Sequence, residues 1–111
     1  MAQGIRTING YTNNYPTATS ASSTLTWNTE YTLGSISSLS CTIPSYAVAD
    51  GAREIRIKFT ASSTFTASIT TSNFTTTYGL SDLSITGGKS YELSFVPLSA
   101  SVLTCVVKEW G

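Results

Sequence analysis

The chain has 111 residues, no formal net charge, and only 11% charged residues, against about 25% in an ordinary domain. This length suits one domain with a core of its own. Six basic and six acidic residues provide no clustered basic surface, so we exclude nucleic-acid binding. Serine and threonine, 18 and 19 residues respectively, supply the missing polarity. Because threonine favours strands and serine favours turns, the composition predicts an all-β protein.

Residues 1–23 differ from the rest of the chain. They are rich in Thr, Asn and Ser, contain few aliphatic residues and show no heptad repeat. We predict an extended polar arm, which is either disordered or becomes ordered on a partner. Four residues of this arm are candidate anchors: Ile5, Ile8, Tyr11 and Tyr15. The arm lacks the apolar core of a secretory signal, and no run approaches a membrane span, so we expect a cytoplasmically made protein without membrane insertion.

From residue 24 onward, apolar and polar residues alternate in short runs. Turn-forming residues separate these runs, at Asp50–Gly51, at "TASST" (60–64) and at "TGGKS" (86–90). Pro97 and the residues after it are expected to end the strand that begins near Tyr91. The pattern predicts six to eight short strands and no helix, typical of a β-sandwich or barrel. We expect a small antiparallel, jelly-roll-like sandwich over residues 24–111.

Cys41 and Cys105 each lie in an alternating strand pattern, two residues from apolar neighbours. The favoured interpretation is two reduced core cysteines, because the cytosol keeps thiols reduced. A disulfide that joins the two strands is the alternative, and it depends on geometry that the sequence does not contain.

Few residues could perform catalysis. The chain has no histidine, the usual general base and commonest metal ligand, and two cysteines cannot form a four-ligand zinc site. Six scattered carboxylates leave a carboxylate-pair hydrolase as a remote alternative. The run "GGKS" resembles a phosphate-binding loop, but Leu83 stands where the first glycine is required. "NFT" (73–75) matches a glycosylation sequon by chance composition. We expect no catalytic residue, cofactor or metal.

Three aromatic residues are candidate binding or interface residues: Trp27, Tyr78 and Trp110. Large aromatic side chains in a small sandwich usually cap the core or fill a subunit interface, and we favour this role. The alternative is an exposed platform that stacks on sugar rings.

Residues 29–111 also contain a series of strand motifs. A strand of the form E-I-x-I-x-F-T is followed by a turn, T-F-T and an aliphatic strand, then by Gly-Lys-x-Tyr-Glu-aliphatic-Ser and a Val-rich strand ending near a Trp. The matching residues are Glu54, Ile55, Ile57, Phe59, Thr60, Thr64, Phe65, Thr66, Gly88, Lys89, Tyr91, Glu92, Leu93, Ser94, Val106, Val107 and Trp110. These motifs, with "SLSCTI" upstream, resemble the C-terminal β-domain of tailed-bacteriophage fibre and head-fibre proteins.

The resemblance implies a virion surface domain, usually trimeric. The corresponding expectation is a non-enzymatic capsid decoration or head-fibre protein that is anchored by residues 1–23 to the major capsid protein or another virion protein. The alternative is a receptor- or carbohydrate-binding tip domain of a tail fibre, which would recognise a host surface glycan.

Overall fold

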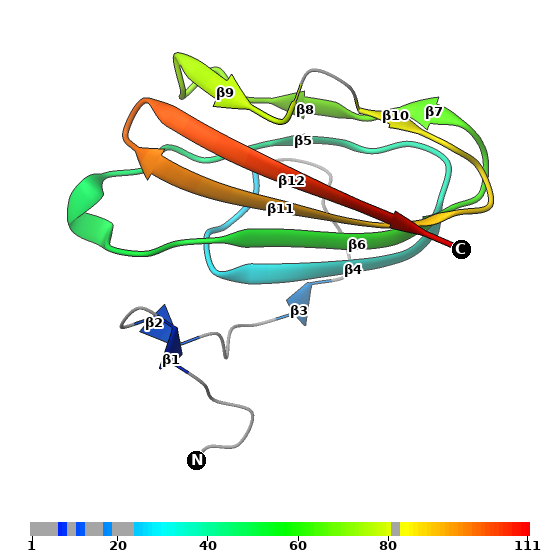
Figure 1. Ribbon diagram of the computed structural model, residues 1–111, viewed down its shortest axis with the longest axis horizontal. Helices are drawn as coiled ribbons and strands as arrows, with labels where there is room; N and C mark the ends of the chain where they lie inside the picture. Colours follow the sequence, from blue (N-terminus) through cyan, green and yellow to red (C-terminus); the bar gives the residue numbers. More distant parts are fainter. Residues whose placement is uncertain (1–6, 9–10, 13–16, 19–23, 81–82) are drawn as a thin grey trace.

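The computed structural model describes residues 7–8, 11–12, 17–18, 24–80 and 83–111, and these residues form an all-β fold (Figure 1). Four strands are long: β4 (Thr29–Ile36), β6 (Ile55–Ala61), β11 (Ser90–Ser99) and β12 (Val102–Trp110). The short strands are β1 (Thr7–Ile8), β2 (Tyr11–Thr12), β3 (Thr17–Ala18), β5 (Ser40–Thr42), β7 (Phe65–Thr66), β8 (Ser68–Thr70), β9 (Thr76–Tyr78) and β10 (Ser84–Ile85). The prediction of an all-β protein is confirmed.

A six-stranded sheet in the order β3-β4-β6-β11-β12-β9 is the largest element. Its centre is the antiparallel set β6, β11 and β12, in which Leu93 lies opposite both Ile57 and Val107. Alternate residues of β6 and β11 are buried because apolar and polar side chains alternate along β6 and most of β11. The sheet therefore has an apolar inner face and an opposite face that carries the polar residues of β6 and of the first half of β11.

The shorter strands cover the apolar face. Two pairs, β5-β8 and β10-β7, form separate two-stranded sheets, and in Figure 1 they run alongside the large sheet. Buried Cys41 of β5 and Ile85 of β10 belong to the same hydrophobic cluster as Ile57 and Phe95 of the large sheet, as does Ala67 between β7 and β8. One shared core thus connects all of these strands, as a chain of this size requires.

The expected antiparallel arrangement is only partly correct, since the sheets are mixed. The pairs β4-β6, β12-β9, β5-β8 and β3-β4 are parallel. Parallel neighbours need a crossover instead of a tight hairpin. Here the chain leaves β4, passes through β5 beside the other strands and returns by the short 3-10 helix η1 (Val48–Asp50) before it enters β6. Gly51 follows η1 with a φ of 79°, so the predicted turn lies at this point.

Pro97 does not end β11, contrary to the prediction from its position. The strand continues to Ser99, and its pairing with β12 shifts register between Pro97 and Ser99. Proline is tolerated because β6 pairs with β11 only as far as Phe95, so no ladder on that side requires a donor at residue 97. The bulge accommodates the proline, and β11 and β12 form one long hairpin.

Both cysteines are buried and free, so the favoured interpretation of two unbonded core thiols is correct. Burial raises the pKa of the Cys41 thiol from 9.0 to about 11 and that of Cys105 to about 12. The cause is desolvation, which disfavours the thiolate. Each side chain therefore behaves as a small apolar core residue.

In the N-terminal segment the structure describes three strand pieces. Ile8 pairs with Tyr11 in the antiparallel ladder of β1 and β2, and β3 adds to β4 in parallel, with Thr17 beside Glu30. The candidate anchors Ile5 and Tyr15 lie outside the described residues. The role of residues 1–23 as an arm remains a prediction.

Candidate functional site

The polar face of the six-stranded sheet carries the candidate site. Cross-strand register groups its side chains into rows. Thr60, Ser90 and Trp110 form one row across β6, β11 and β12, and the next row includes Lys58, Glu92 and Lys108. Because registered neighbours point to the same side of a sheet, these residues share one surface, called here the outer face.

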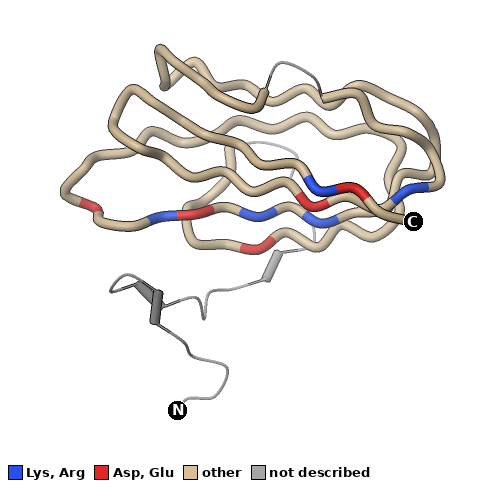
Figure 2. The backbone as a smooth tube through the Cα atoms, in the orientation of Figure 1, with Lys and Arg blue, Asp and Glu red and all other residues tan. Residues whose placement is uncertain are grey.

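Most charged residues of the large sheet lie in one part of it. Figure 2 shows them along β4, β6 and the paired ends of β11 and β12, whereas β5, β7, β8, β9 and β10 carry none. The Lys58 ammonium lies 2.7 Å from the Glu30 carboxylate, and Arg56 lies 3.8 Å from both Glu54 and Glu92. These ion pairs connect β4, β6 and β11. Opposite charges alternate along them, so this part of the face has little net charge.

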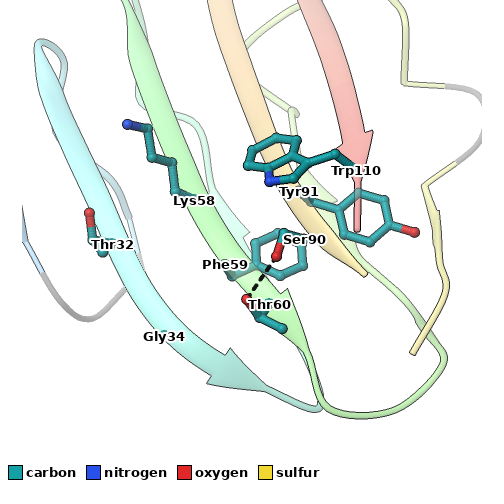
Figure 3. A pocket seen from close by; sticks show the side chains of 8 residues that line it. All are labelled: Thr32, Gly34, Lys58, Phe59, Thr60, Ser90, Tyr91 and Trp110. Atoms are coloured by element: carbon teal, nitrogen blue, oxygen red, sulfur yellow. Dashed lines mark hydrogen bonds between the residues drawn. The ribbon is translucent and has the colours of Figure 1, made fainter. Parts of the chain in front are cut away.

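A hollow of about 190 Å³ lies next to the charged residues (Figure 3). We call it the Trp110 hollow; it is lined by Thr32, Gly34, Lys58, Phe59, Thr60, Ser90, Tyr91 and Trp110. Gly34 has a φ of 73° and lies where the register of β4 and β6 shifts. It has no side chain, and a Cβ built on it would meet nothing within 4 Å. The glycine and the bulge together leave this space open.

The rim of the Trp110 hollow combines an aromatic ring with polar groups. The Trp110 side chain is 52% exposed, and Figure 3 shows its indole extending from β12 toward β11 and β6. The hydroxyls of Thr60 and Ser90 are hydrogen-bonded at 3.0 Å, and Lys58 also lines the hollow, with its ammonium directed toward β4 (Figure 3). The arrangement offers a stacking surface together with hydrogen-bond donors and acceptors.

Elsewhere on the same face, exposed apolar side chains surround Thr104. Tyr78 of β9 and Val96 of β11 lie on either side of Thr104 in register. Leu98 lies two residues beyond Val96 on β11, and Val106 lies two residues beyond Thr104 on β12. We call these four residues, which are between 37% and 63% exposed, the apolar strip. The Thr104 hydroxyl donates to the Val96 carbonyl at 2.8 Å, so it is satisfied within the strip.

The edge of the sheet at β12 is open in the described residues. β9 pairs only with Val102–Thr104 of β12, so Cys105–Trp110 pair with β11 alone. We call this segment the open edge. Such an edge presents unpaired backbone donors and acceptors to a further strand.

Two of the three aromatic candidates lie on the outer face, but the fold does not bring them together. Tyr78 lies beside Thr104, six residues along β12 from Trp110, a separation of roughly 20 Å. Trp27 is elsewhere: its indole N–H donates to the Ser45 carbonyl at 2.8 Å, and its ring meets Tyr46 edge-on at 5.9 Å. It packs against the core cluster.

Val96, Leu98 and Val106 did not emerge from the sequence as surface residues. The sequence nevertheless contains an indication of them, because "FVPL" (95–98) and "CVV" (105–107) are unbroken apolar runs and not alternating ones. A strand with such a run has apolar side chains on both of its faces. No other layer of the described residues covers them on the outer face, so they remain exposed.

In the part of the chain that the structure describes, no three His, Cys, Asp or Glu residues converge to hold a metal ion. The same residues include no helix that is long and apolar enough to cross a membrane. No family model, curated protein or solved structure matches the chain.

Proposed function

We propose that this chain is a non-enzymatic structural protein of a bacteriophage virion, a capsid decoration or head-fibre protein. The observation that carries the proposal is the combination of the apolar strip with the open edge of β12. Four large exposed apolar side chains beside an unpaired strand edge form a surface suited to another protein. The strand motifs that resemble phage fibre and head-fibre domains support the same class of protein.

In this proposal the strands from β4 to β12 form a jelly-roll-like sandwich, the outward body of the protein. Residues 1–23 form the arm that anchors this body to the capsid. The pairing of β3 with β4 supports strand addition as the mode of anchoring, because this piece of the segment already lies as a strand at the sheet edge. The major capsid protein, or another virion protein, would receive the arm.

The neighbour on the open edge is a second copy of this chain, and the assembly is a trimer. Every copy carries the same strand edge, so two copies can pair through it. A closed ring of copies leaves no such edge exposed. The zero net charge of the chain reduces long-range repulsion between copies. The assembly would bury the apolar strip between subunits.

Truncation tests the anchoring role. We expect that deleting residues 2–20 leaves a folded protein that no longer binds phage particles made without it, because the anchor is lost. Binding is measured by the amount of protein that co-sediments with the particles, and folding by the β-sheet circular dichroism signal.

A full-length variant serves as the matched control. Replacing Ile5, Ile8, Tyr11 and Tyr15 with serine keeps the length of the arm but removes its apolar anchors, and should also abolish co-sedimentation. If the truncated and the substituted proteins both bind like the intact chain, the anchoring role of residues 1–23 is wrong.

A further inference from the structure

The Trp110 indole is a flat apolar surface that the fold leaves open to solvent. It lies in one row with two hydroxyl residues, Ser90 and Thr60, and extends over the sheet in their direction (Figure 3). The face of an aromatic ring is electron-rich, and it attracts C–H groups that carry a partial positive charge. A ligand with a C–H face on one side and polar groups around its rim would match this surface.

The charges near the indole favour a neutral ligand. The Lys58 ammonium is already paired with the Glu30 carboxylate at 2.7 Å, so an anion would have to displace a close partner. The pair nevertheless retains hydrogen-bonding capacity, since an ammonium has three donors and a carboxylate has about four acceptor sites. Lys58, which lines the hollow, can therefore still donate to the hydroxyl groups of an uncharged ligand.

The size of the hollow limits the ligand to a small molecule. Its volume is about 190 Å³, below the roughly 300 to 1,000 Å³ of sites that hold drug-sized compounds. The absence of a side chain at Gly34, where a Cβ would meet nothing within 4 Å, keeps the side opposite Trp110 open. One ring therefore fits directly, while the rest of a longer ligand would extend into solvent.

We propose that the Trp110 hollow is a binding subsite for one neutral pyranose ring of a glycan. The C–H face of the sugar stacks on the Trp110 indole. Its hydroxyl groups exchange hydrogen bonds with the Thr60–Ser90 pair and accept from the Lys58 ammonium. The proposal does not depend on a virion role, because it rests only on the groups that line this hollow.

The test is a titration of the full chain, labelled with nitrogen-15, followed by NMR. The probes are methyl β-D-glucopyranoside, methyl β-D-galactopyranoside and N-acetylglucosamine, each compared with inorganic phosphate. The indole N–H signal of Trp110 should shift in a saturable way with at least one sugar, with a dissociation constant on the order of 1 mM. The indole N–H of Trp27, already donated to the Ser45 carbonyl, should stay in place.

Three variants separate the stacking surface from its surroundings. Trp110→Ala should abolish saturable shifts of the backbone signals around the hollow. Val48→Ala is the control, because Val48 is also an exposed apolar side chain but lies on η1, outside both the hollow and the apolar strip, and it should bind like the parent. Lys58→Met should weaken binding about tenfold, the effect of one lost charged hydrogen bond.

Four outcomes would overturn the subsite. The first three are a saturable response to phosphate but to none of the sugars, equal loss of binding in Val48→Ala, and undiminished binding in a folded Trp110→Ala protein. The fourth is the absence of any saturable response to the sugars. Each of these results would leave the virion proposal unaffected.

Discussion

Gly79 shows how closely two strands of this fold approach each other. It follows β9 with a φ of 82°, and a Cβ built on it would lie 2.0 Å from the backbone carbonyl oxygen of Cys105. Only glycine can occupy such a position, because its neighbour is rigid strand backbone and the left-handed conformation strains other residues. The glycine allows β9 to turn away from β12 at the point where the open edge begins.

We predict that Gly79→Ala destabilises the protein strongly. The left-handed backbone alone costs roughly 1 to 2 kcal/mol for alanine, and the contact with β12 adds a steric cost on top of it. Gly34→Ala is the matched control, since its φ of 73° is similar but a Cβ there meets nothing within 4 Å. Urea unfolding should rank Gly79→Ala as clearly less stable than Gly34→Ala, and equal losses would contradict the close contact.

The two buried thiols make the free energy of unfolding depend on pH in the alkaline range. Their folded pKa values, about 11 for Cys41 and about 12 for Cys105, lie above the ordinary 9.0. Below pH 9 both states keep the thiol protonated. Above it, the unfolded chain loses protons that the folded chain retains, so the free energy of unfolding falls.

Each thiol should therefore reduce stability by about 1.4 kcal/mol per pH unit above pH 9, until its folded pKa is reached. A Cys41→Ala/Cys105→Ala protein keeps the other titrating groups and isolates this effect. The parent should lose urea stability more steeply than the variant between pH 9 and 10.5. Parallel pH profiles would show that the thiols are not protected by burial.

At the scale of the elements, the strand β6 was the part of the fold most readily predicted. Ile55, Ile57 and Phe59 alternate with charged residues, and all three are buried on the inner face. Local alternation is sufficient here because β6 lies in the middle of the sheet, where one face meets the core and the other meets water.

Features that depend on the path of the chain could not be predicted in this way. Parallel pairing of β4 with β6 requires knowledge of the crossover between them, and the tolerance of Pro97 requires knowledge of where β6 stops. The Trp110 hollow joins Gly34, Thr60 and Trp110 from three strands. The sequence marked Trp110 as a candidate, but it did not indicate its neighbours.

The apolar strip and the open edge give a prediction about assembly. Val106 lies on the outer face within the open edge and is 56% exposed. In the proposed assembly, Val106→Glu places a carboxylate in an apolar contact between copies, and we expect it to convert the proposed trimer to a monomer. Light scattering measures the molar mass of each form.

Val48→Glu is the matched control, because Val48 is similarly exposed but lies on η1, outside the apolar strip. It makes the same charge change and should remain trimeric. A parent protein that is monomeric at tens of micromolar, or loss of the trimer in both variants alike, would be inconsistent with assembly through this surface.

At the scale of the whole molecule, the chain combines a single hydrophobic core with a surface that carries few charges. Strands from the large sheet and from both short sheets contribute to one apolar cluster, and the charged residues gather on one side (Figure 2). The strands β5, β7, β8, β9 and β10 carry no charged residue. An uncharged surface of this kind suits the burial between neighbouring copies that the proposed assembly requires.

The most direct test of the virion role is immunogold electron microscopy of phage particles from the source of this sequence, with antibody raised against the purified chain. Antibody pre-absorbed with the same protein serves as the control. The proposal predicts gold over the capsid shell. Gold at the tail tip would place the protein in a tail fibre and contradict the decoration role, and particles without specific labelling would contradict a virion role altogether.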